Sequence, residues 1–432
     1  MSAKYARYRM QVYNKSSLAD AACSFMNIGE SIQYLALDGI YRTIGVNPAD
    51  IIDVTADDVA HYTGDRLYLP GKFILNDRPV NRVLPFPEDV VPVLISSVML
   101  RNEEIPQELV EYLKRVEPIG CRDEQARTML RELGIEAYLM GCFTMCLPRR
   151  ASGPKPGEGK TFLVDISDNL YPYIPPELKK NAVRISHAVP VYTTRMTVEE
   201  DDRLNREAET LLQRYRDEAD LVITSRLHAA APCIAMGIPV VLASDNIDFR
   251  YAWLDKYVPI YTLDDYGRID WSPRVPSSEE AKRWIPAYIK KRLSGDPAAV
   301  EELKKLDAFY MDRDRVDYYG YFRTRIGRAG EMAGRRDFRY IIWGAGLHSG
   351  YAYDIIRELY PEAELVSVID KYERGVRFGK EIIPGEKLTE KNFDVAFITT
   401  KPGTPDAVEK MAQLFGPEAE RRCIIVTSQQ KS

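Results

Sequence analysis

An arginine and a histidine stand together at the end of an apolar segment, and their chemistry suits an anionic substrate. Residues 221–224 read LVIT and lead into Ser225, Arg226, Leu227 and His228. A guanidinium offers a planar fork for carboxylate or phosphate, and an imidazole can transfer protons near neutral pH. The pattern therefore predicts a functional site for an anionic substrate at the end of this strand. The alternative is that Arg226 pairs with an acidic neighbour while His228 caps a helix or packs at the strand end.

Two further groups have the same kind of position, each between an apolar segment and a helix. Arg122 and Asp123 follow PIGC, and Asn27, Gly29 and Glu30 open a helical pattern. Backbone N–H groups at a helix start can hold an anion or a substrate hydroxyl. The simpler interpretations are that Asp123 and Asn27 are plain helix caps and that Arg122 is a surface charge.

A glycine-rich turn near the C-terminus resembles a nucleotide-binding fingerprint. Gly344, Gly346 and Gly350 follow an apolar strand and open a helix, and Asp370 ends the next strand. The spacing is G-x-G-x-x-x-G, one residue longer than the dinucleotide motif. The turn is a candidate nucleotide site; alternatively its glycines serve tight packing and bind nothing.

The elements around these residues predict an α/β fold. The stretch 220–250 reads as strand, turn, small-residue helix and strand, a unit whose strands run parallel. Further strands are expected at 8–12, 51–55, 67–76, 90–98, 118–123, 135–142, 161–167, 339–343, 364–370 and 393–400. Helices are expected at 27–46, 107–116, 124–134 and 201–219, and amphipathic helices from about 276 to 330. Strands that alternate with helices indicate parallel sheets, which bind ligands at their carboxyl ends.

A chain of 432 residues is too long for one core. We expect an N-terminal Rossmann-like domain over 1–150 and a second one over 151–275. The Gly- and Pro-rich stretch 149–160 is the linker between them. A helical connector over 276–335 and a smaller Rossmann-like module of unknown ligand over 336–432 complete the prediction.

Composition excludes several classes of protein. A net charge of −5 with both signs interspersed argues against a nucleic-acid binder. Six cysteines are few for this length and favour reduced thiols and a cytoplasmic protein, with Cys142 and Cys146 as buried free thiols. The N-terminus lacks a signal-peptide core and no apolar stretch is long enough to span a bilayer, so membrane contact would be at most peripheral. No metal-ligand cluster stands out.

Three of these segments together resemble the polysaccharide pyruvyl transferase family over about residues 8–270. NIGESIQYLAL is similar to its N-x-G-D box, IGCRDEQARTMLRELGIEAYLMGCFTMCL to its central element, and DLVITSRLHAAAPCIAMGIPVVLA to its RLH box. The first box ends in Glu30 where the family usually has Asp, which shifts the carboxylate by one methylene. The C-terminal module is additional to the core family.

The resemblance implies two Rossmann-like domains in a GT-B-like arrangement with the site between them. It also implies phosphoenolpyruvate as donor, without a further cofactor, and a hexose hydroxyl pair as acceptor, giving a pyruvate ketal. By position, Arg122 and Arg226 match donor-binding residues, with Ser225 and Leu227 beside them, and His228 and Arg226 match catalytic ones. Asn27, Gly29, Glu30 and Asp123 then fall on the acceptor side. The acceptor's linkage, any lipid carrier and the oligomeric state stay open.

Other functions remain alternatives to this interpretation. A GT-B glycosyltransferase would use an activated sugar at the same arginines and histidine, because a fold does not determine its chemistry. A non-catalytic sugar or nucleotide sensor would depend on the C-terminal module. A dehydrogenase built on the glycine turn is the weakest alternative, because only His348 accompanies it as an acid–base group.

Overall fold

The computed structural model forms two compact units, residues 1–315 and 316–432, which we call unit 1 and unit 2. It describes residues 3–14, 25–77, 83–100, 105–155, 157–190, 195–245, 249–275, 277–312, 318–389, 392–400 and 403–426. Cys23 lies outside these ranges, and the five cysteines within them are free. Each unit is described separately below.

The first sheet of unit 1 is built from parallel strands in the order β4-β1-β5-β6. Its strands are β1 (Lys4–Tyr8), β4 (Ile51–Val54), β5 (Leu67–Gly71) and β6 (Val90–Leu94). A single parallel bridge, Ser97 to Cys121, continues it to the parallel pair β7 (Ile119–Cys121) and β8 (Ala137–Leu139). The strand predicted at 8–12 was wrong, because the chain pairs earlier, at 4–8, where only Ala6 is fully buried.

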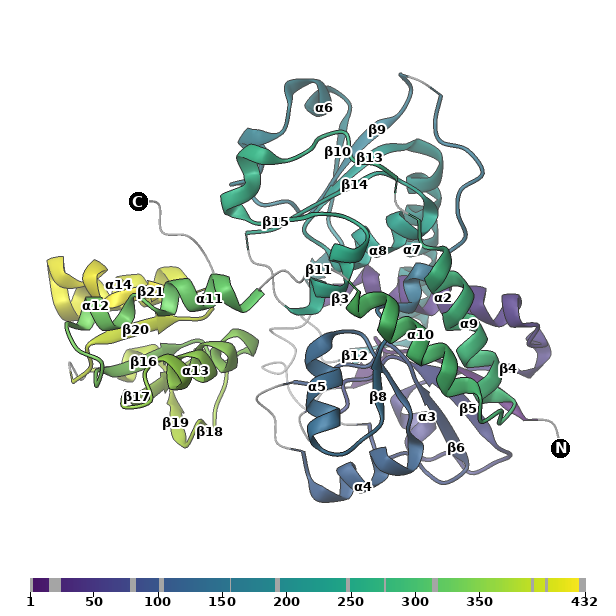
Figure 1. Cartoon of the computed structure of the whole chain (residues 1–432), viewed down its shortest axis with the longest axis horizontal. Coiled ribbons are helices and arrows are strands. Elements are labelled where there is room, and N and C mark those ends of the chain that lie inside the picture. Colours follow the sequence, from purple (N-terminus) through teal and green to yellow (C-terminus); the bar gives the residue numbers. More distant parts are fainter. Residues whose placement is uncertain are drawn as a thin grey trace. The chain divides into compact units, whose positions relative to one another are not determined.

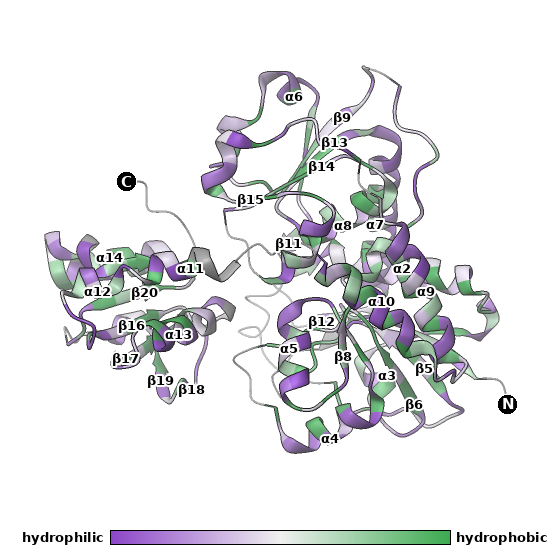
Figure 2. Ribbon diagram, viewed as in Figure 1, coloured by the Kyte–Doolittle hydropathy of each residue, from purple (hydrophilic) through white to green (hydrophobic). Residues whose placement is uncertain are grey.

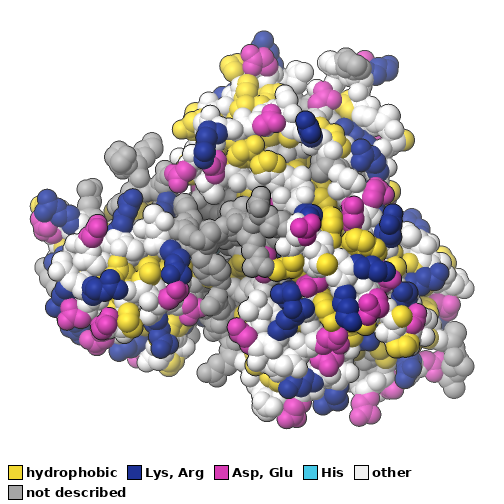
Figure 3. Space-filling view, viewed as in Figure 1, with side chains coloured by type: hydrophobic (Ala, Val, Ile, Leu, Met, Phe, Trp, Pro, Cys, Tyr) yellow, Lys and Arg dark blue, Asp and Glu magenta, His cyan; other side chains and the backbone are white. Residues whose placement is uncertain are grey.

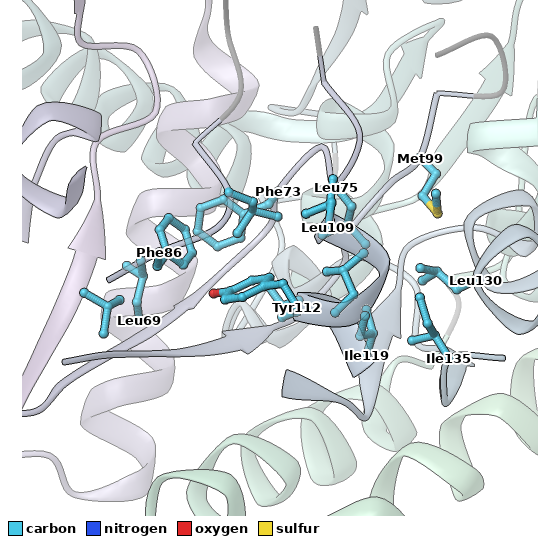
Figure 4. Close-up of a cluster of buried hydrophobic side chains, with 14 of the residues drawn as sticks. Leu69, Phe73, Leu75, Phe86, Met99, Leu109, Tyr112, Ile119, Leu130 and Ile135 are labelled. Carbon is cyan, nitrogen blue, oxygen red and sulfur yellow. The ribbon is translucent and has the colours of Figure 1, made fainter. Parts of the chain in front are cut away.

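Helices and aromatic side chains give the first sheet its core. The helices that follow its strands are α2 (Ile28–Ile44), α3 (Ala56–Ala60), α4 (Gln107–Val116) and α5 (Glu124–Glu132). In Figure 4, Phe73 and Phe86 lie near Tyr112 of α4 and Leu69 of β5, all of them buried. Apolar burial of this kind is the main force that holds helices onto a sheet.

The second sheet of unit 1 has five parallel strands in the order β10-β9-β13-β14-β15. They are β9 (Lys160–Val164), β10 (Ala182–Ile185), β13 (Ala219–Thr224), β14 (Val240–Ala243) and β15 (Ile260–Tyr261). Its helices are α6 (Pro176–Lys180), α7 (Val198–Glu218) and α8 (Leu227–Met236). Every residue of α8 is buried, and a left-handed Gly237 ends it at φ 74°.

Helices and short strands join the two sheets of unit 1. In Figure 1, α2 lies between the sheets, where it packs against α7 and α8. Two antiparallel pairs connect the N-terminal segment to the second half: β2 with β12, and β3 with β11. These are β2 (Tyr13–Asn14), β3 (Phe25–Asn27), β11 (Ala188–Pro190) and β12 (Arg195–Met196).

After the second sheet the chain returns to the first. Helix α9 (Glu279–Leu293) contacts β6, and α10 (Ala299–Met311) packs on β8. Arg127 of α5 holds Asp307 of α10 at 2.5 and 2.9 Å, and the Leu139 amide donates to the same carboxylate at 2.7 Å. At the other end, Lys282 of α9 donates to the Ala235 carbonyl of α8 at 2.8 Å. Helix α9 thus contacts elements of both halves of unit 1.

Unit 2 is a separate α/β domain with its own core. Its sheet has the order β18-β19-β17-β16-β20-β21, parallel except for β18. The strands are β16 (Arg339–Trp343), β17 (Glu364–Ile369), β18 (Val376–Arg377), β19 (Lys380–Ile383), β20 (Val395–Ile398) and β21 (Cys423–Ile425). The helices are α11 (Tyr318–Ile326), α12 (Ala329–Ala333), α13 (Leu347–Leu359) and α14 (Thr404–Phe415).

The predicted α/β class is confirmed by these mainly parallel sheets. Figure 2 shows the central strands as hydrophobic and the exposed sides of helices such as α9 and α10 as largely hydrophilic, the pattern expected for buried sheets covered by amphipathic helices. On the face shown in Figure 3, Lys and Arg are interspersed with Asp and Glu, and neither sign dominates.

Candidate functional site

The chemistry-bearing residues of unit 1 lie where its parallel strands end. In each sheet the strand order reverses direction beside the first strand, between β1 and β5 and between β9 and β13. Ligands of open α/β sheets bind at the carboxyl ends of strands at such points. Lys72 directly follows β5, Asp165 follows β9, and Arg226 stands two residues after β13.

His228 is buried against the start of α2. It is the second residue of α8 and only 8% exposed. A Cβ atom added to Gly29 would lie 2.5 Å from its Nδ1, so the glycine allows the helix to approach the ring this closely. On the other side, the ring Nε2 lies 3.9 Å from the Sγ of Cys142. His228 therefore joins the two halves of unit 1 at one point.

Burial controls the protonation of His228. It lowers the pKa of the imidazole to about 3, and the positive charges of Arg122 and Lys72 act in the same direction while Glu30 opposes them. His228 is therefore neutral at pH 7. Its pKa lies well below the value near 7 that was expected for a general acid at this position.

Glu30 and Lys72 form an ion pair beside this histidine. The Lys72 Nζ lies 3.6 Å from the Glu30 Oε2, and the Gln33 amide donates to the same oxygen at 2.6 Å. Burial alone would raise the pKa of Glu30, but the charges of Lys72, His228 and Arg122 outweigh it and lower the pKa. Glu30 is therefore a carboxylate among cations.

Arg122 is a buried cation at the end of β7. Its side chain is 9% exposed, and its Nε, which has no hydrogen-bond partner among the described residues, lies 3.8 Å from Asp123. Its amide donates to the Ser97 carbonyl at 2.9 Å, which fixes the turn that follows β6. Asp123 is fully buried and caps α5, where its Oδ1 accepts from the Ala126 amide at 3.0 Å.

Arg226 lies at the corresponding point of the second sheet and is more exposed. Its Nε donates to Asp165 at 2.8 Å, with 37% of the side chain exposed. Its amide donates to the Thr224 Oγ1 at 2.8 Å, and the Ser225 hydroxyl donates to the Asp165 carbonyl. Leu227, the first residue of α8, is buried. Within the described ranges, Asp165 is the hydrogen-bond partner of the Arg226 guanidinium.

A second buried histidine lies beside Asp165. His187 is 1% exposed, its ring Nε2 lies 2.9 Å from the Tyr215 hydroxyl, and its amide donates to the Asp165 Oδ2 at 2.8 Å. Burial lowers the pKa of His187 to about 4, so this ring is also neutral at pH 7. The His187 carbonyl accepts from the Ile28 amide at 3.0 Å, which ties it to the start of α2.

The structure thus brings Glu30, Arg122 and His228 into one cluster around the start of α2. Asn27 caps that helix by accepting from the Gly29 amide at 3.0 Å. The sequence prediction missed Lys72 and Asp165. Both follow apolar strands directly, as Arg122 does, so the same positional rule applied to every strand would have found them.

Cys142 contributes a thiol to this cluster. The side chain is fully buried, and burial raises the pKa of the thiol above its usual value, so it is protonated at neutral pH. A thiol in this state packs against His228 and is no nucleophile.

The glycine turn of unit 2 also lies at a strand-order reversal, between β16 and β20. Gly344 has φ 106°, and a Cβ there would lie 2.7 Å from Thr400. Asp370 accepts from the Ala345 amide at 2.7 Å and from the Tyr372 amide at 2.8 Å. Gly346 caps α13 and Gly350 is buried within it. Internal contacts thus occupy the Asp370 carboxylate that a ribose would use.

Two searches of the described ranges set limits on other chemistry. Within those ranges, His, Cys, Asp and Glu side chains form no group of three that could hold a metal ion. None of the helices described there combines the length and the apolar character needed to cross a bilayer.

Comparison with known proteins finds a similarity between part of unit 1 and one family model. No curated protein matches the chain. A crystal structure of a functionally uncharacterized protein from Klebsiella pneumoniae shares 10% identity with a TM-score of 0.30, over 57% of this chain and 87% of that one. Residues 96–246 match the family model described as polysaccharide pyruvyl transferase. Arg122, Arg226 and His228 all lie within this matched range.

Proposed function

We propose that the protein transfers the enolpyruvyl group of phosphoenolpyruvate to two hydroxyls of a hexose in a glycan or its precursor, forming a pyruvate ketal. The observation that carries the proposal is the cluster of Glu30, Arg122 and His228, of which Arg122 and His228 lie in the range that matches the family model. Phosphoenolpyruvate carries a carboxylate and a phosphate, and Arg122 and Arg226 supply cations from the ends of two different sheets.

The reaction needs one proton donor and stabilisation of a departing phosphate. A proton adds to the methylene carbon of the donor, and one sugar hydroxyl bonds to the central carbon and loses its proton. The C–O bond to phosphate then breaks, and the second hydroxyl closes the ketal as its proton leaves. The products are the ketal and inorganic phosphate. The protons balance, because the two sugar hydroxyls lose two protons, while the methylene carbon gains one and the phosphate gains the other.

His228 is the proposed proton donor, and donor binding explains how it acquires its proton. In the unliganded protein, burial and the charges of Arg122 and Lys72 hold the pKa of His228 at about 3. An anionic donor bound to those cations would offset their charge, while Glu30 would continue to favour the imidazolium. The pKa of His228 should therefore rise when the donor binds.

Binding and turnover test this proposal together. Phosphoenolpyruvate should raise the Tm of the wild-type protein more than a nucleotide sugar does, because binding to the native state stabilises it. His228→Ala should keep that Tm shift but release phosphate from phosphoenolpyruvate and a hexose acceptor about 10²- to 10⁴-fold more slowly. His61→Ala, at an exposed histidine, is the matched control.

Two outcomes would contradict the proposal. Full turnover by His228→Ala would remove this residue as the acid. Stabilisation by nucleotide sugars with no response to phosphoenolpyruvate would instead favour a glycosyltransferase at the same residues.

A further inference from the structure

The ammonium group of Lys72 is buried without an adequate partner. The side chain is 8% exposed, and its Nζ lies 3.6 Å from the Met10 sulfur and 3.6 Å from the Glu30 carboxylate. Among the described residues no oxygen accepts from it at hydrogen-bond distance. An ammonium has three donors to satisfy, and its one hydrogen bond goes to sulfur, a weak acceptor, so most of the hydrogen-bonding capacity of this buried charge is unmet within the described residues. Such a group points to a ligand that completes its contacts.

Two neighbouring donors are unsatisfied in the same way. The Ser97 hydroxyl is fully buried and has no hydrogen-bond partner within the described parts of the chain, and neither has the Arg122 Nε. Most buried polar atoms are hydrogen-bonded, so adjacent exceptions need an explanation.

These three residues follow strands that are consecutive in the chain, two of the first sheet and β7, which a single bridge joins to it. Lys72 follows β5, Ser97 lies three residues after β6, and Arg122 follows β7. The Ile95 amide donates to the Gly71 carbonyl at 3.0 Å, and the Arg122 amide donates to the Ser97 carbonyl at 2.9 Å, so the three turns are joined. Ser96 takes a left-handed backbone at φ 50°, and its Oγ accepts from the Phe143 amide at 3.0 Å, which fixes the middle turn.

We propose that Lys72, with Arg122 and Ser97, forms the subsite for the phosphoryl group of the donor. The proposal rests on the proposed function and assigns one end of the donor to this half of unit 1. On binding, a phosphoryl oxygen takes the place of Glu30 as the partner of Lys72, and others accept from Arg122 and Ser97.

The type of each cation decides which end of the donor it holds. Lysine is a compact charge with three rotatable donors, which suits a tetrahedral phosphoryl group, whereas the planar guanidinium fork matches a carboxylate. In Arg226, Nε is held by Asp165 and the other guanidinium nitrogens have no hydrogen-bond partner among the described residues, so this arginine is suited to the carboxylate. Phosphate would then leave from the same subsite, beside two cations that stabilise its charge.

The test compares Lys72→Met with Lys72→Arg. Calorimetric titration with inorganic phosphate and with phosphoenolpyruvate should show Kd values about 10- to 100-fold higher for Lys72→Met, the usual loss of a charge-assisted hydrogen bond. Lys72→Arg should recover most of that loss. Lys72→Gln, which keeps a polar head group, should weaken binding as Lys72→Met does and replaces it if the apolar side chain disturbs folding.

Lys4→Met is the matched control. Lys4 begins β1 of the same sheet at its amino end, where it pairs with Asp50 at 3.1 Å. Removing that charge should leave both Kd values unchanged. In the turnover assay, Lys72→Met should raise the KM for phosphoenolpyruvate, and Lys4→Met should not.

The possible results separate this proposal from the proposed function. Wild-type affinity of Lys72→Met for phosphate and phosphoenolpyruvate would overturn the subsite, even if the wild-type protein makes ketals. Loss of phosphate affinity in Lys72→Met, with a wild-type protein that turns over a nucleotide sugar but not phosphoenolpyruvate, would support the subsite and overturn pyruvyl transfer.

Discussion

Two buried histidines in unit 1 should make its stability depend on pH. Burial lowers the pKa of His187 to about 4 and that of His228 to about 3, whereas an unfolded histidine titrates near 6.5. Between about pH 6.5 and 4 the unfolded chain therefore binds protons that the native protein does not. The contribution of these two histidines to the free energy of unfolding is complete above pH 6.5. It decreases as the pH falls through this window.

Chemical denaturation at pH 7, 6 and 5 measures this effect. Each histidine should contribute a loss of about 1 kcal/mol per pH unit below pH 6.5. His187→Gln should make the loss shallower, and His61→Gln, at an exposed histidine, should leave it unchanged. An unchanged slope in His187→Gln would show that this histidine is protonated in the native protein.

At the level of residues, position along the strand was predictable and burial was not. Arg122, Arg226 and His228 were predicted because each lies just beyond an apolar strand. The same sequences do not reveal that Arg122 and His228 are buried while Arg226 pairs with Asp165. Burial depends on which elements pack over a side chain, and for His228 that element is α2, about 200 residues away.

The start of α2 is the element that sets the position of His228. In Gly29→Ala, the new Cβ atom would lie 2.5 Å from the Nδ1 and 2.6 Å from the Cβ of His228, so the imidazole ring or the helix must move. Overpacking of this kind costs about 1–3 kcal/mol, and a shift of 1 Å at a reacting group can cost about 100-fold in rate. We expect Gly29→Ala to lower both the Tm and the turnover.

The same helix supplies the control. Gly39 also lies in α2, and a Cβ there would meet nothing within 4 Å. Gly39→Ala should therefore stabilise the protein by about 0.5–1 kcal/mol, because alanine favours a helix over glycine, with turnover unchanged. Equal turnover in the two variants would mean that the approach of α2 does not position His228.

Long elements were predictable from sequence, and the shortest were not. The helices α2, α4 and α5 lie close to their predicted ranges, because each has an apolar face, and α2 and α5 also begin at a capping side chain. Strand β1 was misplaced because its sequence, KYARY, carries two charged residues and only one buried residue, Ala6. Strands β2, β3, β11 and β12 have two or three residues each, too few for a periodic pattern.

At the scale of the whole molecule, the two units have separate hydrophobic cores. One cluster around Phe73 and another around Leu163 lie within unit 1, and those around Phe338 and Phe393 lie within unit 2. A chain that ends at residue 312 should therefore fold and show the same Tm shift with phosphoenolpyruvate as the full chain.

Thermal denaturation of that truncated chain, with and without the ligand, checks the prediction. Loss of the ligand response in a folded truncated chain would indicate that unit 2 contributes to donor binding, as the sensor alternative requires. A truncated chain that does not fold would contradict the independence of the two cores.

The pairing of β3 with β11 has a consequence for synthesis. A ribosome makes residues 25–27 long before residues 188–190, their only strand partner within the described ranges. The first sheet can assemble as soon as its own strands emerge, but the start of α2 cannot be fixed until much of the second half exists. The nascent chain therefore carries an unpaired strand for most of the translation of unit 1, and the candidate site is completed late in the formation of that unit.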